Sequence, residues 1–196
     1  MFLPFSKRSR DWEPIGLELR KLLKLRLDDR LNPWELAPMV GLHVVDPTVA
    51  FAALEVGDRE HLLGEGKREW SGGVCPHPLP DGKLLCILNP THSSRRNKIT
   101  LMEEIVHAHR KHRPSTLVFE EDGLRFRDYD AKQEEEAYGV GAAALLPWQT
   151  FFRRVNAGRT IDDLAEDYDV TPHLVGYRIK ITGLYAVFRK RQQKGA

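Results

Sequence analysis

Residues 98–112 are the stretch that most constrains how this chain can fold. Apolar residues recur there at helical spacing: Leu101, Ile105 and Ala108. The spacing predicts a helix with one face buried, capped by Asn97 or Thr100. On that helix Glu103 and His107 lie four residues apart, so their side chains share a side.

The run from Glu103 to His107 reads E-E-I-V-H and differs by one residue from H-E-x-x-H, the pattern of metalloprotease helices. In that pattern two histidines one turn apart hold zinc, and the intervening glutamate activates water. Here Glu103 stands at the first histidine position. Three interpretations remain open: a variant metal site, an inactive one, or a coincidence.

Composition narrows the class of protein. The chain has 196 residues, 41% hydrophobic and 30% charged, which is typical of a globular protein with one medium domain or a domain plus a small appendage. Its net charge of +2 is too small to argue for nucleic-acid or membrane binding. No stretch approaches the ~20 apolar residues that span a bilayer, and residues 1–10 do not have the pattern of a secretion signal. With only Cys75 and Cys86, we expect free thiols and a cytoplasmic location.

The segments before the central helix predict further helices and a short strand. Residues 11–28 have leucines among basic residues, which predicts an amphipathic helix. A second helix is expected to start after Asn32 as N-cap and to end at Gly41, followed by a strand at 42–45. Residues 49–63 are compatible with either a helix or a loop.

Two hairpins are predicted, one on each side of the central helix. Residues 70–74 and 83–88 flank a turn rich in proline with an Asp-Gly pair, so that the two cysteines could face each other across the pair of strands. Residues 116–119 and 124–127 flank a second turn at 120–123. Both patterns favour antiparallel pairing.

Residues 131–146 predict another helix, whose glycines and alanines would let a neighbouring helix approach its backbone closely. Glu134, Glu135 and Glu136 precede this small-residue run. Composition alone favours a solvated first turn for them, stabilised by the helix dipole.

From about residue 150 the chain predicts short helices, and residues 160–178 have the spacing of a helix-turn-helix. Asp169 occupies the turn position where glycine is usual. A DNA-reading segment should be basic along its second helix, but here five acidic residues of the segment oppose a single basic one, Arg178. They are Asp162, Asp163, Glu166, Asp167 and Asp169. The pattern favours a packing role and argues against direct DNA binding.

Several motifs taken in chain order carry a resemblance to a known family. They are Trp34-Glu35-Leu36-Ala37, the end of a strand at Asn89-Pro90, Thr100 to His107, Glu134-Glu135-Glu136-Ala137, Leu145-Leu146-Pro147 and the helix-turn-helix-like segment. Together they resemble the ImmA/IrrE family of bacterial and phage metallo-endopeptidases over roughly residues 15–185. The resemblance implies an α+β, zincin-like fold. Residues 11–149 would form the peptidase domain, with N-terminal helices, a small, mostly antiparallel sheet, the metal-site helix and a second glutamate-bearing helix. Residues 150–196 would form a helical, helix-turn-helix-like segment packed on it.

The same resemblance implies the roles of individual residues. His107 matches the second metal-binding histidine, Glu104 the general base, and Glu134 the glutamate ligand of the later helix, with Glu136 as the alternative if the helix phase differs. Glu103 departs from the family pattern.

The geometry of a regular helix limits what can replace the missing histidine. His109 points to the opposite flank from His107, and His112 lies five residues on and far round the helix, so neither is expected to pair with His107. Glu103 is then the only local candidate, and a carboxylate is an accepted zinc ligand. A ligand set of one imidazole and two carboxylates predicts zinc, with a shift in preference towards manganese or iron(II).

The sequence therefore predicts a metal-dependent endopeptidase that hydrolyses a peptide bond in a partner protein. The resemblance implies that this partner is a helix-turn-helix repressor of a phage or mobile element. The alternative is a catalytically degenerate pseudo-peptidase that acts as a repressor-binding module. A purely DNA-binding protein is the third hypothesis.

Overall fold

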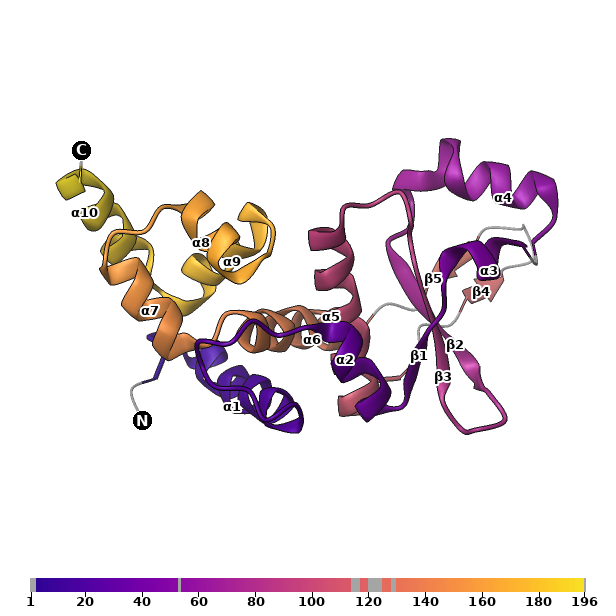
Figure 1. Cartoon of the computed structure of the whole chain (residues 1–196), viewed down its shortest axis with the longest axis horizontal. Helices are drawn as coiled ribbons and strands as arrows, with labels where there is room; N and C mark the ends of the chain where they lie inside the picture. Colours follow the sequence, from indigo (N-terminus) through magenta and orange to yellow (C-terminus); the bar gives the residue numbers. More distant parts are fainter. Residues whose placement is uncertain (1–2, 53, 114–116, 120–124, 128–129, 196) are drawn as a thin grey trace.

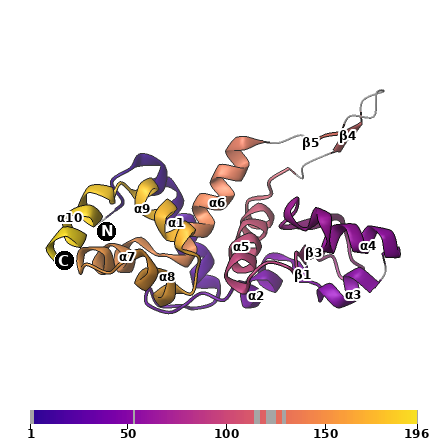
Figure 2. The same cartoon turned by 90° about the horizontal axis from the view of Figure 1, so that it is seen from above.

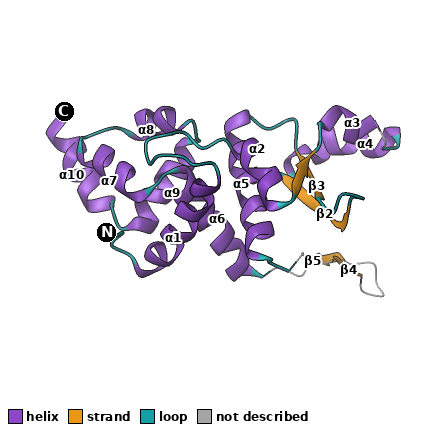
Figure 3. Ribbon diagram, turned by 60° about the horizontal axis from the view of Figure 1, so that its bottom comes forward, coloured by secondary structure: helices purple, strands orange, loops and turns teal. Residues whose placement is uncertain are grey.

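The computed structural model describes residues 3–52, 54–113, 117–119, 125–127 and 130–195. Helices dominate (Figure 3), and a small sheet lies at one end of the molecule (Figure 1). The C-terminal helices lie at the other end, and two long helices, α5 (Ser94–Arg110) and α6 (Ala131–Leu145), lie between. The mixed α+β fold expected from the sequence is confirmed.

The elements follow one another along the chain with the following bounds. They are α1 (Lys7–Leu22), α2 (Pro33–Leu36), the 3-10 helix η1 (Ala37–Val40), β1 (Leu42–Val44), α3 (Pro47–Ala52), α4 (Val56–Leu63), the 3-10 helix η2 (Glu65–Arg68), β2 (Gly72–Pro78), β3 (Leu84–Leu88), α5 (Ser94–Arg110), β4 (Leu117–Phe119), β5 (Arg125–Arg127), α6 (Ala131–Leu145), α7 (Trp148–Asn156), α8 (Ile161–Tyr168), α9 (Pro172–Thr182) and α10 (Tyr185–Gly195).

The three-stranded sheet has the order β1-β3-β2, in which β3 pairs antiparallel with β2 and parallel with β1. The first predicted hairpin is therefore confirmed. Its register differs from the expected one, because Cys86 pairs with Val74 and not with Cys75. Both cysteines are free, and burial raises the pKa of the Cys86 thiol to about 12. Cys86 is therefore a core residue in its thiol form.

The second predicted hairpin is also confirmed, because β4 and β5 pair antiparallel. Figure 2 shows these two strands away from the three-stranded sheet and from the C-terminal helices. The predicted turn at 120–123 lies outside the described residues.

The central helix α5 starts earlier than the sequence predicts. Ser93 is its N-cap, and the Ser93 side chain accepts a hydrogen bond from the backbone N–H of Arg96 at 3.3 Å. Asn97 and Thr100 both lie inside the helix, so the predicted cap at either residue is wrong. Serine is as good a cap as asparagine and comes first along the chain, which gives the helix an additional turn.

The small residues of α6 bring other helices close, as predicted. A Cβ atom on Gly16 of α1 would lie 2.7 Å from the backbone nitrogen of Ala144, and one on Gly139 would lie 2.2 Å from the ring of Trp12. A Cβ atom on Gly141 would lie 3.4 Å from the Cβ atom of Met102 on α5. Because α6 packs closely against both helices, the side chains at its N-terminal end are held beside α5.

The helix-turn-helix-like segment packs against α5. Asp169 ends α8 in the left-handed conformation with φ 53°, and its carboxylate is held by Arg95 and Lys98. Arg178 on α9 is fully buried and forms an ion pair with Glu13 of α1, so it is not available to a nucleic acid. None of the described helices is long and apolar enough to cross a membrane. The division of the chain at residue 150 stays a prediction.

Candidate metal centre

Helix α5 positions the candidate site because one of its faces is fixed in the core. Leu101, Ile105 and Val106 are fully buried. The adjoining face carries Glu103 and His107 one turn apart, and both line a pocket of about 240 Å³. Core packing therefore fixes the rotation of the helix, and the rotation aims this pair at the pocket.

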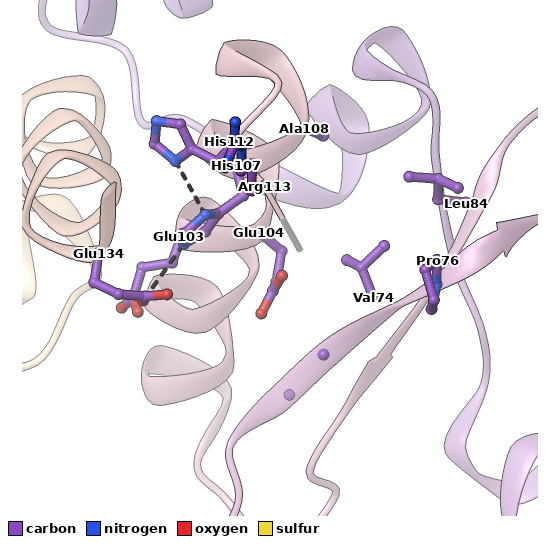
Figure 4. Close-up of a pocket in the computed structure, with 12 residues that line it drawn as sticks. Val74, Pro76, Leu84, Glu103, Glu104, His107, Ala108, His112, Arg113 and Glu134 are labelled. Atoms are coloured by element: carbon purple, nitrogen blue, oxygen red, sulfur yellow. Dashed lines mark hydrogen bonds and ion pairs between the residues drawn. The ribbon is translucent and has the colours of Figure 1, made fainter. Parts of the chain in front are cut away.

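The pocket lies between α5, strand β2 and the N-terminal end of α6, as Figure 4 shows. All four predicted site residues line it: Glu103, Glu104, His107 and Glu134. Its remaining lining residues are Gly72, Gly73, Val74, Pro76, Leu84, Ala108, His112 and Arg113. The tertiary structure thus brings the four predicted site residues together, although they are up to 31 positions apart in the sequence.

His107 and Glu134 are the two predicted ligands in direct contact. The Nε2 atom of His107 lies 3.5 Å from Oε2 of Glu134. Two ligands of a tetrahedral zinc ion, each about 2.1 Å from the metal, lie about 3.4 Å apart. The separation of these two atoms therefore suits a shared cation.

Glu103 lies next to this pair, and ionisation of its carboxyl group is unfavourable there. Burial raises the pKa of its carboxyl to about 8, and the charges of Glu104 and Glu134 add to the effect. Burial also lowers the pKa of His107, an effect that Glu134 opposes. A neutral imidazole and a cluster of carboxylates are the donor types that a divalent cation requires.

The donor types fit a metal ion, but their arrangement is incomplete. Within the described ranges, no three or more histidine, cysteine, aspartate or glutamate side chains already stand close enough together to hold one. The His107–Glu134 pair has ligand spacing, and the Glu103 carboxyl would have to turn towards it to complete the set. The carboxyl groups nevertheless gather on the same side of α5 as the His107 ring (Figure 4).

The three glutamates at the start of α6 do not form the solvated turn that composition favours. Glu134 meets His107, Glu135 forms an ion pair with Arg8, and Glu136 pairs with Arg110. Glu136 does not line the pocket, so the structure favours Glu134 over this alternative ligand. The sequence missed these partners because they come from distant segments.

The expectation that His112 stays away from His107 is wrong. The helix ends at Arg110, and Lys111 adopts the left-handed conformation with φ 55°, which turns the chain back. As a result Nδ1 of His112 lies 3.0 Å from Nδ1 of His107. His109 points elsewhere, as predicted, with its Nε2 atom 3.9 Å from a Glu18 oxygen. Pro114 just beyond was the one sequence signal for such an ending, because proline commonly follows a left-handed helix cap.

A scan of family models gives one match that covers more than half of the chain. Residues 69–180 match Peptidase_M78, described as the IrrE N-terminal-like domain. The chain belongs to this peptidase family. The predicted resemblance to the ImmA/IrrE family is thereby confirmed, and the α+β fold is consistent with the zincin-like fold of the family. Comparisons with curated proteins and with solved structures gave no match.

Proposed function

We propose that this M78-family protein is a metal-dependent endopeptidase. In this proposal Glu103, His107 and Glu134 hold a divalent cation, and Glu104 is the general base. The observation that carries the proposal is the distance of 3.5 Å between His107 Nε2 and Glu134 Oε2. The raised pKa of the neighbouring Glu103 supports it. Membership of the family supports it independently.

The electrostatics of the pocket favour a bound cation. Glu103, Glu104 and Glu134 share one pocket, and like charges at short range oppose one another's ionisation. Arg110 on the same helix is paired with Glu136, which does not line the pocket, so among the described lining residues the three carboxyl groups share the pocket with one arginine, Arg113. A divalent ion would compensate the carboxylates and allow Glu103 to ionise. Zinc is the default metal, while two carboxylates and one imidazole also suit manganese or iron(II).

The residues around this cation fit peptide hydrolysis. When bound, the ion supplies a Lewis acid that polarises a peptide carbonyl and makes water more acidic. Glu104 lies between Glu103 and strand β2 in Figure 4, where it can take a proton from water and transfer it to the leaving nitrogen. Its neighbour in sequence, Glu103, faces the cation side of the pocket.

Strand β2 gives a reason to expect an internal peptide bond as substrate. It is an edge strand, and Gly72, Gly73 and Val74 line the pocket beside Glu104. A Cβ atom on Gly73 would meet nothing within 4 Å, so the face of the strand is open at this position. An extended peptide can add to such an edge by main-chain hydrogen bonds and continue past the site on both sides. From the resemblance, the proposed substrate is a helix-turn-helix repressor of a phage or mobile element, and the proposed location of the chain is the cytoplasm.

A catalytically degenerate pseudo-peptidase is the second candidate. The replacement of a histidine by Glu103 and the incomplete ligand cluster favour it. In this alternative the fold is kept as a module that binds the repressor, and Glu103 stays protonated near neutral pH.

Metal content separates the two candidates. Protein purified without chelator and incubated with Zn²⁺, Mn²⁺ or Fe²⁺ is analysed for bound metal after gel filtration, alongside Glu103→Ala and Glu134→Ala. We expect stoichiometric metal in the wild type and a strong loss in both variants. Glu135→Ala is the matched control, because Glu135 is adjacent in sequence but pairs with Arg8 outside the pocket. A wild-type protein that retains no metal would favour the pseudo-peptidase.

A further inference from the structure

His112 contacts His107 through a backbone turn that ends helix α5. Lys111 in the left-handed conformation lets the His112 backbone N–H bond to the His107 carbonyl at 3.0 Å. This is the 6→1 bond of a Schellman motif. It places the two imidazole rings edge to face, with their centroids 4.9 Å apart. The His112 side chain is only 7% exposed, so its ring is held in place.

The other nitrogen of His112 faces a carboxylate from α6. Nε2 of His112 lies 3.4 Å from Oε2 of Glu136, and Oε1 of Glu136 accepts a hydrogen bond from Arg110 at 2.9 Å. An ionised carboxylate only accepts hydrogen bonds. The negative charge of Glu136 therefore favours the tautomer of His112 that carries its ring proton on Nε2.

The position of that proton determines the protonation pattern of the next ring. With Nε2 protonated, a neutral His112 has a lone pair on Nδ1, which lies 3.0 Å from Nδ1 of His107. His107 then donates from its own Nδ1–H, and its Nε2 lone pair is directed at Glu134. Without a metal ion each arrangement leaves one lone pair facing a carboxylate: His107 Nε2 faces Glu134 in the first, and His112 Nε2 faces Glu136 in the reverse. A cation bound between His107 and Glu134 removes the first conflict and leaves the second. A cation between His107 and Glu134 requires the first arrangement.

We infer that His112 and Glu136 are positioning residues that fix the orientation and tautomer of His107, so that its Nε2 lone pair is available to a metal ion. The inference rests on the proposed metal centre. Histidine ligands of metals are commonly oriented by a hydrogen bond to their second nitrogen, and loss of that partner typically costs about 10- to 100-fold in metal affinity. Here the partner is a second histidine, held in turn by a carboxylate.

The test compares zinc affinities by chelator competition for the wild type, His112→Phe and His112→Asn. Phenylalanine keeps the ring but offers no acceptor, so we expect zinc binding to weaken by about 10- to 100-fold. Asparagine can place its carbonyl oxygen near the position of Nδ1, so we expect its affinity to remain within about threefold of the wild type. His109→Phe is the control, because His109 lies on the same helix and faces Glu18 outside the pocket.

Melting temperatures of the chelator-treated proteins show whether each variant folds, and His112→Leu, which also offers no acceptor, replaces the phenylalanine variant if that one does not. Long-range ¹H–¹⁵N spectra of the zinc-loaded wild type should show His107 protonated on Nδ1. Equal zinc affinity in wild type and His112→Phe would overturn the inference and leave the metal centre standing. Equal weakening by phenylalanine and asparagine would also overturn it, because ring packing would then be the cause. If the wild type binds no zinc, the proposed metal centre fails and this inference fails with it.

Discussion

Replacing Glu103 by glutamine should stabilise the metal-free protein at high pH. Burial and the charges of Glu104 and Glu134 raise the pKa of Glu103 from 4.5 to about 8 in the folded chain. Between these two values the folded chain binds a proton that the unfolded chain has released. The free energy of unfolding therefore falls as pH rises from about 4.5 to about 8. Above that range the folded chain bears the full cost of an ionised Glu103.

The size of the effect follows from the two pKa values. At about 1.4 kcal/mol for each pH unit, the difference between 4.5 and about 8 corresponds to a cost of about 5 kcal/mol. That cost is comparable to the whole stability of a marginal domain, about 5–15 kcal/mol. Glutamine has nearly the same shape and does not ionise, so the variant should not have this pH dependence.

The assay is urea unfolding of chelator-treated wild type and Glu103→Gln at pH 5, 7 and 9. We expect the stability of the variant relative to the wild type to increase by roughly 3–4 kcal/mol between pH 5 and pH 9. Glu135→Gln, at a partly exposed side chain that pairs with Arg8 outside the pocket, should follow the wild-type pH dependence. With saturating zinc the order should reverse, because the wild type gains more binding free energy than a variant that lacks one ligand. Parallel pH curves for wild type and Glu103→Gln would refute the reasoning.

Four further substitutions test the site and the packing that holds it. Glu104→Gln should abolish peptide hydrolysis and leave metal content nearly unchanged, as measured by elemental analysis beside a cleavage assay; equal loss of both would contradict its role as base. Gly16→Ala should destabilise by about 1–3 kcal/mol in urea unfolding, because the new Cβ would lie 2.7 Å from the backbone nitrogen of a residue on α6. Gly176→Ala on α9, where a Cβ meets nothing within 4 Å, should be neutral or stabilise by up to about 1 kcal/mol; a similar loss from both would argue against the close α1–α6 contact. Glu13→Ala should cost about 3–5 kcal/mol, since it leaves the buried Arg178 cation without its carboxylate, and a thermal or urea transition close to that of the wild type would disprove this.

Much of the fold could be predicted from local sequence patterns. The hydrophobic period of α5, the helix end at Gly41, the two hairpins and the small-residue face of α6 are confirmed. Each of these depends on nearby residues or on an intrinsic backbone preference. The start of α5 at Ser94 was missed because several residues in the preceding loop can cap a helix, and tertiary packing selects among them.

The candidate site was only partly predictable. Helical spacing placed Glu103 and His107 on one side of α5, and the resemblance to a family supplied Glu134. The contact between His112 and His107 depends on a left-handed lysine, which residue type alone does not predict. A prediction that extends the regular helix to His112 therefore points its side chain away from His107, whereas the helix ends at Arg110.

The sequence by itself determined which groups are available: a histidine and several carboxylates at helical spacing on an amphipathic segment. The tertiary structure decided which of them meet. Close packing of α6 against α5 brings Glu134 to His107, and the same packing places Glu136 in contact with His112 and Arg110. Side chains on different helices are placed by the distance and rotation of those helices, and these depend on the whole core rather than on any local run of residues.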